Sequence, residues 1–449
     1  MTSGEDLTQS LGRELFTLVQ KETRPIIKPY WWKGKAIMWF ARDDNLRTQM
    51  LRFVDVFPVL KTTEEKNQHM REHFIQGLQR TPPIFRIADA LSRFPIGAKI
   101  VASVAEQGIK TIGQHFIVGP TPEEVLIAIK KLQKEGASYT LDVLGEAVLS
   151  EYEADKYVRR YISLMEQLSS LDCPRIDISL KLSALYSQFD PIDFEGSVEA
   201  VKNRLRKILR VAKNMGAPVT LDAEQYQYRD LTLKIFREIF DEEEFKNFEN
   251  AGIAMATYFL DSEEKIRELI GWAKGRGAPI LVRLVKGAYW DWEIITAAQK
   301  RWPIPVYREK WQTDTCFERC THLLLENCDV IRLGVASHNI RSCAQAMAKA
   351  KAHILDVPRD RLEFQVLLGM GDPLMRAILR MGYSVRAYIA SGELLPGMGF
   401  LVRRIIENTS QTGFLFQSLG AGVPVEELLK SPQGVAKERQ HDFMKKPAS

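Results

Sequence analysis

The chain has 449 residues, of which 45% are hydrophobic and 27% are charged, with 28 glycines and 20 prolines. This composition is typical of a folded globular protein, and it excludes intrinsic disorder, collagen and a coiled coil. The 62 basic and 57 acidic residues leave a net charge of only +5. That charge marks no nucleic acid as a partner and gives weak support for an anionic ligand.

The number and spacing of the cysteines, and the absence of long apolar runs, indicate the cellular compartment in which we expect the protein. The five cysteines, at positions 173, 316, 320, 328 and 343, form an odd set without a CxxC pair. Neither a disulfide framework nor a cysteine-based zinc site is indicated, which favours a reducing environment. The start MTSGEDLTQS has no signal-peptide pattern, and no run of about 18 apolar residues occurs. We expect a cytoplasmic protein, which still allows peripheral docking on the inner membrane.

Up to about residue 115 the chain shows only helical periodicity, and no strand pattern interrupts it. The apolar positions that recur at helical spacing fall in three segments: Leu11, Leu15 and Leu18; Met50, Phe53, Val54 and Val59; Ile84, Ile87 and Leu91.

An aromatic cluster lies within this helical region. Residues 29–40 read PYWWKGKAIMWF and hold three of the eight tryptophans. A membrane or nucleic-acid contact is one interpretation. The favoured interpretation is that these aromatic side chains pack an arm against the main domain or a second subunit.

From about residue 137 short runs rich in Val, Ile and Leu alternate with longer amphipathic segments. Eight such units in about 290 residues fit one closed parallel (β/α)₈ barrel better than an open doubly wound sheet. The candidate strands cover residues 138–145, 175–184, 218–223, 252–259, 279–288, 329–337, 362–369 and 384–391, with candidate helices at 153–170, 194–214, 228–247, 262–275, 312–327 and 340–353.

The predicted domain order follows from these two patterns. We expect an N-terminal helical arm over residues 1–45, a small α-helical domain over 46–115, the barrel over 116–430 and a polar tail over 431–449.

A barrel of this kind places its chemistry at the carboxyl ends of the strands. Charged residues in apolar strands are costly to bury unless they are paired or hold a ligand, so several that converge on one mouth suggest a site. The polar residues at these ends are Glu146, Lys181, Asp222, Glu224, Arg283, Lys286, Tyr289, Ser337, His338, Asn339, Gln365 and Tyr388, followed by Arg403 and Arg404 on the next helix.

The segment SGELLPGMGFLVRRIIENT (391–409) carries the most information. Pro396 can start a helix on which Arg403, Arg404 and Glu407 lie within one turn. A lone RRxxE is equally consistent with a solvated ion-pair face. The start of the eighth barrel helix lies at the catalytic mouth, where a guanidinium pair suits the bidentate capture of a carboxylate or phosphate.

Single candidates carry less weight. His338 suits either a base or phosphate donor or an ordinary structural hydrogen bond, whereas Lys181 inside ISLKLSAL needs an anionic partner or a lowered pKa. The histidines show no HExxH or similar spacing, so no metal is expected. No GxGxxG or Walker A stretch occurs, and a Rossmann dinucleotide site is not supported.

These residues lie in stretches that resemble the proline dehydrogenase domain of bacterial proline utilization A proteins. The similarity covers about residues 137–415 in matching order, and the helical region before residue 115 resembles the family's arm and small helical domain less specifically. The matching stretches are LDVLGEAVLSEYEAD (141–155), ISLKLSALY (178–186), TLDAEQ (220–225), RLVKGAYWD (283–291), ASHN (336–339), EFQVLLGMGDPL (363–374) and ELLPGMGFLVRRIIENTS (393–410).

The resemblance implies a distorted (β/α)₈ barrel that binds FAD without a Rossmann fold. It implies oxidation of L-proline to Δ1-pyrroline-5-carboxylate by hydride transfer to flavin N5, with electrons passed to a quinone at the membrane surface. It assigns the proline carboxylate to Arg403, Arg404 and Lys181. The remaining substrate-pocket residues that it implies are Tyr289, Leu367 and Tyr388 around the ring, and Glu146 and Asp222 at the polar end. The catalytic residues that it implies are Lys181, Asp222, Arg403 and Arg404.

The same resemblance implies a set of flavin-binding residues. Arg283 would lie near N5, Lys286 and His338 near the ribityl or phosphate part, and Trp290 and Glu407 near the outer portions. Gly287, Ser337, Asn339 and Gln365 complete the set. The family usually has a glutamine near the flavin in the fourth strand, whereas this chain has Ala256 there.

Two other functions are less consistent with the sequence. A flavin barrel that oxidises another small cyclic amino acid, such as hydroxyproline, is disfavoured because Tyr388 would crowd a 4-hydroxyl group. A scaffold or DNA-binding role, which some members of the family add, needs a ribbon-helix-helix module whose basic β-strand this sequence lacks.

The length suggests how the chain relates to that family. Proline utilization A proteins continue into an aldehyde dehydrogenase half, and no such sequence follows here. We therefore expect either a monofunctional enzyme or, in preference, one domain of a longer chain, with a homo-oligomer as an open alternative.

Overall fold

The computed structural model describes residues 4–23, 44–78, 81–145, 148–173, 175–352, 357–393, 397, 400, 402–404 and 423–445. The aromatic cluster at 29–40 lies outside these residues.

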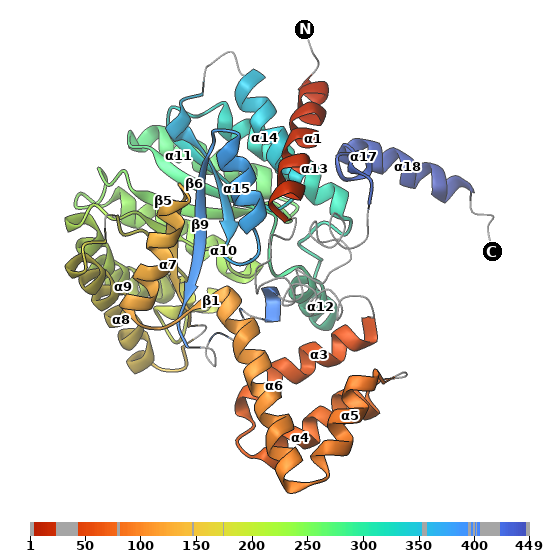
Figure 1. Cartoon of the computed structure of the whole chain (residues 1–449). Coiled ribbons are helices and arrows are strands. Elements are labelled where there is room, and N and C mark those ends of the chain that lie inside the picture. Colours follow the sequence, from red (N-terminus) through yellow and green to blue (C-terminus); the bar gives the residue numbers. More distant parts are fainter. Residues whose placement is uncertain are drawn as a thin grey trace.

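The described strands form one sheet, in which β2 to β9 pair in chain order and β9 also pairs with β2, so that the sheet closes (Figure 1). Every pairing is parallel. The predicted (β/α)₈ barrel is therefore confirmed, with strands mostly shorter than expected. Their bounds are β2 Ser138–Val143, β3 Ile178–Leu180, β4 Val219–Leu221, β5 Ala251–Ala256, β6 Ile280–Val285, β7 Ile331–Ala336, β8 Leu362–Leu367 and β9 Ser384–Ser391.

Alternation along each strand sends one set of side chains into the barrel. In β6, Ile280, Val282 and Leu284 are fully buried members of the main apolar core. Two residues of the alternate set, Arg283 and Val285, line a cavity at the barrel mouth. The single strand ILVRLV (280–285) thus contributes one set of side chains to the main apolar core and the other set to the cavity wall.

Helices cover the barrel between consecutive strands (Figure 1). Two of them, α12 and α15, were not among the helices predicted from periodicity. The bounds are α8 Glu151–Ser170, α9 Phe194–Asn214, α10 Tyr226–Asp241, α11 Ser262–Arg276, α12 Trp290–Lys300, α13 Lys310–Leu325, α14 Ile340–Ala352 and α15 Asp372–Arg380, with α7 Pro122–Lys134 before β2 and α17 Val425–Leu428 and α18 Pro432–Lys445 after the barrel.

The N-terminal helix α1 (Gly4–Thr23) packs on α14 and α15. Its apolar side chains Leu11 and Leu15 are buried in the main core. Arg341 donates to the Glu5 carboxylate at 2.7 Å, and Arg376 donates to Glu22 at 2.9 Å. These contacts attach the N-terminal segment to barrel helices that lie more than 300 residues away in the chain.

A small helical unit precedes the barrel and lies next to its mouth (Figure 1). It comprises α3 (Asp44–Val56), α4 (Thr63–Arg71), α5 (Pro83–Ser92) and α6 (Pro95–Phe116), and α6 runs into the short strand β1 (Ile117–Val118), which pairs with β9. Its core includes Phe53 and Phe74, and the same cluster continues into Met370 and Phe400 of the barrel. The domain boundaries predicted from the sequence stay a prediction.

Within the described ranges, none of the helices combines the length and the apolar character that crossing a lipid bilayer requires.

Candidate active site

A cavity of about 320 Å³ opens at the carboxyl ends of the strands. Strands β3 to β9 and the residues after them all contribute to its wall. The site residues predicted from the sequence that line it are Lys181, Asp222, Arg283, Lys286, Gly287, Tyr289, Ser337, His338, Gln365, Leu367, Tyr388, Arg403 and Arg404.

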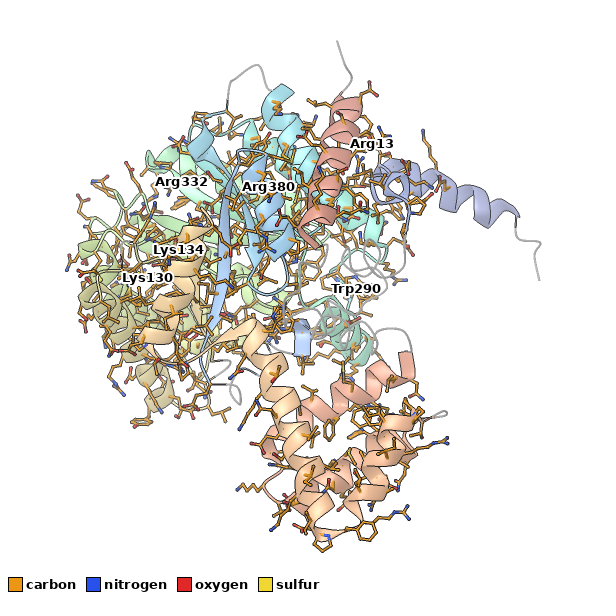
Figure 2. The ribbon with its side chains drawn as sticks, in the orientation of Figure 1. Arg13, Lys130, Lys134, Trp290, Arg332 and Arg380 are labelled. Atoms are coloured by element: carbon orange, nitrogen blue, oxygen red, sulfur yellow. The ribbon has the colours of Figure 1, made fainter. Side chains whose placement is uncertain are left out.

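Four predicted site residues are not among the described residues that line this cavity. Glu146 and Glu407 lie outside the described residues. Trp290 is at the start of α12 (Figure 2), where its indole N–H donates to the Tyr307 carbonyl at 2.8 Å. Asn339 accepts from the Ser342 backbone N–H at 3.0 Å near the start of α14.

Asp222 is the centre of the polar network. Its Oδ1 accepts from Arg283 at 2.5 Å and from the Ser179 hydroxyl at 2.6 Å. Its Oδ2 accepts from the Tyr388 hydroxyl at 2.6 Å and from Lys181 at 3.4 Å. Burial alone would raise the pKa of Asp222, but Lys181 and Arg283 hold it below its ordinary value. Asp222 is therefore a buried carboxylate anion that fixes two cations and a phenol.

Lys181 has a second anionic partner that the sequence reasoning did not identify. Its ammonium donates to Asp142 Oδ2 at 2.8 Å, and the Asp142 side chain is fully buried. Burial would lower the pKa of Lys181, but Asp142, Tyr388 and Asp222 raise it well above its usual range. Lys181 therefore stays protonated, and the sequence-based requirement for an anionic partner is met.

Arg283 is held in place from two sides. Its Nε donates to Gln365 Oε1 at 2.6 Å, and the Gln365 amide in turn donates to Glu363 at 2.6 Å. Glu363 also accepts two hydrogen bonds from Arg386, at 2.7 and 2.8 Å. Because the Gln365 amide nitrogen donates to Glu363, the amide oxygen is the end that faces Arg283. Glu363 and Arg386 were not predicted as site residues.

A second basic site lies beside the first. Lys286 donates to Asp314 at 2.5 Å, and Lys310 donates to the other oxygen of Asp314 at 2.6 Å. Burial lowers the pKa of Lys286, although Asp314 opposes the shift. Burial would raise the pKa of Asp314, but the two lysines hold it at about 2. Lys286, Lys310 and Asp314 thus combine two amines with one carboxylate. This surplus of basic side chains suits an anionic part of a ligand.

His338 is a neutral acceptor in this site. The Leu367 backbone N–H donates to His338 Nε2 at 3.0 Å, so that nitrogen carries no proton. Burial, followed by repulsion from Arg404, lowers the pKa of His338 to about 4. A Cβ at Gly371 would lie 2.9 Å from His338 Nε2, which explains a glycine at that position.

This lowered pKa predicts a pH dependence of stability. Above pH 6.5 neither state takes up the proton, and between pH 6.5 and 4 only the unfolded chain does. Falling pH should therefore remove up to about 3 kcal/mol of stability. His338→Gln, measured by urea unfolding at pH 7.5 and 5.0 with FAD held constant, should show a flatter dependence. The same slope in His338→Gln and in the control His322→Gln, whose side chain is 43% exposed, would contradict this account.

The two arginines predicted to bind a carboxylate both reach the cavity wall. The Arg403 guanidinium lies 5.4 Å from the centre of the Tyr289 ring, and Arg404 lies 5.0 Å from that of Phe400. Arg404 is buried, and residues 402–404 are helical as expected. Each guanidinium group therefore lies over an aromatic ring, whose electron-rich face attracts the cation.

Part of the cavity wall is lined by small side chains. Ala254 and Ala256 of β5 and Ala336 of β7 all contribute to it. That Ala256 takes the place of the family's glutamine stays a prediction. Gly287 has φ +136°, and a Cβ there would lie 2.3 Å from the Tyr258 ring. A flat ring can approach such a wall closely.

The residues fit a flavin on one further observation. Arg283 Nη2 is buried and has no hydrogen-bond partner among the described residues. A buried guanidinium N–H without an acceptor is costly, and a ligand carbonyl or ring nitrogen would satisfy it. In the part of the chain that the structure describes, no group of His, Cys, Asp and Glu side chains is arranged to hold a metal ion.

Comparison with known proteins agrees with this geometry. The sequence profile described as proline dehydrogenase matches residues 125–417, and the profile described as proline utilization A N-terminal domain matches residues 5–116. The bifunctional protein PutA of Escherichia coli is 27% identical over 348 residues, which is 75% of this chain and 26% of that protein. Proline dehydrogenase 1 of Bacillus subtilis is 27% identical over 70% of this chain and 92% of its own.

This chain is also similar to a solved structure over nearly its whole length. The crystal structure of proline utilization A from Bdellovibrio bacteriovorus, inactivated by N-propargylglycine, superposes with a TM-score of 0.86 at 36% identity. The match covers 96% of this chain and 44% of that one. The chain thus spans about a quarter of the E. coli protein and under half of the Bdellovibrio protein.

Proposed function

Because the chain belongs to the proline dehydrogenase family, we propose that it oxidises L-proline to Δ1-pyrroline-5-carboxylate with FAD as cofactor and a quinone as electron acceptor. The observation that carries the proposal is the cavity itself. It joins Arg403 and Arg404 to the buried network of Asp222, Lys181 and Arg283 at one barrel mouth.

The flavin is assigned to the side of the cavity formed by β6, β7 and β8. Arg283 supplies an N–H that has no partner among the described residues, Lys286 supplies a positive charge, and Gln365 orients the Arg283 guanidinium. Ser337, His338 and Gly287 line the same region. When bound, the flavin accepts the hydride that leaves proline.

The substrate is assigned to the side that holds the arginines. Arg403 and Arg404 bind the proline carboxylate, with Lys181 as the third cation. Two guanidinium groups and an ammonium match a carboxylate in charge and in hydrogen-bond geometry. The residues that enclose the pyrrolidine ring are Tyr289, Leu367 and Tyr388.

The chain's own residues then act by positioning and by charge. Asp222 holds the Tyr388 hydroxyl and the Lys181 ammonium in fixed places, so that the walls of the pocket are set before substrate arrives. The cationic surroundings favour proline as the neutral amine, whose nitrogen lone pair assists departure of the C5 hydride. One hydride and the remaining amine proton leave as the C5–N double bond forms.

A visible spectrum tests this proposal most directly. The purified chain with FAD should show flavin absorption that bleaches when L-proline is added without an electron acceptor and returns when a quinone is supplied. D-Proline at the same concentration serves as the control and should leave the spectrum unchanged. A preparation that FAD cannot reconstitute, or one that L-proline does not bleach, would overturn the proposal.

A further inference from the structure

The Gln365 side chain crosses from β8 over β7 to reach Arg283 on β6. The strand register places Gly334 of β7 between Arg283 on one side and Glu363 on the other. The Gln365 amide fills the space left by the missing side chain, and a Cβ at Gly334 would lie 2.6 Å from Gln365 Nε2. Gly334 does not have a positive φ, so the strand itself does not require a glycine. A glycine inside a strand marks such a close approach of another group, and here that group is Gln365.

Glu363 is a charged carboxylate at the far end of this crossing. Burial alone would raise the pKa of Glu363, but Arg386 holds it below its ordinary value. Arg386 also donates to Asp177 Oδ2, at 2.5 Å. A carboxylate only accepts hydrogen bonds, so Glu363 binds the Gln365 amide nitrogen, at 2.6 Å, and leaves the amide oxygen to face Arg283. The charge of Glu363 therefore decides the direction of the Gln365 amide.

The Gln365 oxygen is one of two hydrogen-bonding anchors on the Arg283 guanidinium. Nε donates to Gln365 at 2.6 Å, and Nη1 donates to Asp222 and Ser179 at 2.5 and 2.8 Å. Anchors at one nitrogen let the planar group turn about that contact, whereas anchors at two nitrogens fix its plane. The Tyr388 ring, centred 5.2 Å from the guanidinium carbon, attracts the charge without selecting a direction for Nη2. Loss of the Gln365 anchor would therefore release the direction of Nη2, which has no partner among the described residues.

We propose that Glu363 is a positioning residue for the reaction: acting through Gln365, it sets the orientation of Arg283 and thereby the reduction potential of the flavin. This inference rests on the part of the proposed function that places FAD beside Arg283. A flavin gains negative charge when it accepts a hydride, so a guanidinium fixed beside it stabilises the reduced form over the oxidised form. Gly334 belongs to the same arrangement, because it leaves the space that the Gln365 amide needs.

The charge of Glu363 and its effect through Gln365 act on the flavin in opposite directions. If Glu363 acted only through its own field, removal of its negative charge would favour the reduced flavin and raise the potential. Acting through Gln365, the same removal frees the amide to turn, loosens the Arg283 guanidinium and lowers the potential. The sign of the shift therefore separates a positioning role from a direct electrostatic role, and a role in folding alone gives no shift.

Redox titration of the whole FAD-loaded chain against a reference dye tests the proposal. In Glu363→Met the reduced flavin should lose at least tenfold in affinity relative to the oxidised flavin, which is a fall of about 30 mV for a two-electron couple. Gly334→Ala should lower the potential without any change in charge, because the new Cβ displaces the far end of the Gln365 side chain. Glu363→Gln keeps one acceptor oxygen, so its potential should lie between those of Glu363→Met and the unmodified chain.

Each variant has a matched control. Glu22→Met also removes a carboxylate that holds arginines, since Glu22 is 11% exposed in its side chain and pairs with Arg376 and Arg380 of α15. Gly271→Ala adds a Cβ at a position on α11 where no other atom would lie within 4 Å of it. Neither control should move the potential.

The combined variant tests whether both changes act through Gln365. Glu363→Met with Gly334→Ala should lower the potential no further than the larger single change, whereas independent effects would add. The limiting rate of flavin reduction by L-proline should fall in both single variants, while the proline concentration for half of that rate changes less than twofold. Loss of Glu363 leaves Arg386 with Asp177 alone, so Gly334→Ala decides the question if Glu363→Met does not fold.

Dithionite supplies the electrons in the titration, so the potentials are measured whether or not L-proline bleaches the flavin. An unchanged or raised potential in Gly334→Ala, or a raised potential in a folded Glu363→Met, would show that Glu363 does not act through Gln365. A chain that binds FAD but is not bleached by L-proline would contradict the proposed function and leave the positioning role standing if the potentials shift as expected. A chain that does not bind FAD would overturn both.

Discussion

Replacement of Asp222 by alanine is expected to destabilise the folded chain by about 3–5 kcal/mol, because it leaves Lys181 and Arg283 as buried cations without their shared anion. Burial of an unpaired charge is costlier than loss of one hydrogen bond. Lys181 keeps Asp142 as a partner at 2.8 Å, so the larger part of the loss should come from Arg283. Proline oxidation should also fall sharply, since the Tyr388 hydroxyl loses its acceptor.

The measurement is the apparent midpoint of urea unfolding, with fluorescence and circular dichroism compared at matched FAD concentration. Asp222→Asn keeps oxygen and nitrogen atoms for Ser179 and Tyr388 but removes the charge, and it should lie between alanine and the unmodified chain. Asp360→Ala is the matched control. The Asp360 side chain is 75% exposed, and its Oδ2 atom lies as far as 3.8 Å from Arg361 Nε. Exposed pairs of this kind contribute little. An Asp222→Ala midpoint equal to that of Asp360→Ala would refute the central role of Asp222.

The barrel and most of its mouth could be predicted from the sequence for a physical reason. Parallel strands covered on both faces read as apolar runs, and ILVRLV (280–285) is an example. A charged residue in such a run has few tolerable places, which is why Arg283 could be assigned to the interior. Gly287, and the arginine pair after the last strand, supported the same prediction of a site at the barrel mouth.

The missed residues show where this reasoning stops. Asp142, Glu363 and Arg386 are charged residues within apolar strands, the same signal that identified Lys181, but they lie among residues whose partners are far away in sequence. Pairing of the neighbouring strands β8 and β9, whose register the sequence does not show, brings Glu363 within 2.7 Å of Arg386. Asp314 has no such signal, because a charged residue on a helix such as α13 is ordinary.

Two predicted flavin-binding residues, Trp290 and Asn339, are not among the described lining residues of the cavity, and their role stays a prediction. Trp290 follows the cavity residue Tyr289 directly, yet it starts a helix and its indole donates to the Tyr307 carbonyl instead. Asn339 follows His338, yet its side chain accepts from the start of α14. Periodicity likewise found the stripe of Ile84, Ile87 and Leu91 but could not show that no described part of the chain covers it.

Arg403→Met is expected to raise the KM for L-proline at least tenfold, with a smaller effect on kcat. A charge-assisted pair with a carboxylate contributes on the order of 1.5–3 kcal/mol, which corresponds to a factor of about 10 to 150 in affinity. Methionine keeps most of the apolar contact that the arginine stem makes, and Arg404 and Lys181 still supply positive charge. Binding should therefore weaken without losing the pocket.

The design separates charge from geometry. Arg403→Lys keeps the charge but replaces the planar fork by a single ammonium, so its KM should lie between those of the methionine variant and the unmodified chain. Arg319→Met is the matched control, since Arg319 is on α13, is 65% exposed in its side chain and pairs with Glu263; its KM should not change. The flavin spectrum of each variant must also match that of the unmodified chain.

The two possible failures have different meanings. An unchanged KM in Arg403→Met, with the flavin spectrum intact, would show that Arg403 does not bind the carboxylate and would leave Arg404 and Lys181 to do so. A lost flavin spectrum would instead place Arg403 on the cofactor side of the cavity. Because the guanidinium lies 5.4 Å from the Tyr289 ring, the Tyr289→Leu variant adds a further check. It should raise KM in the same direction, since it removes the aromatic face that orients Arg403.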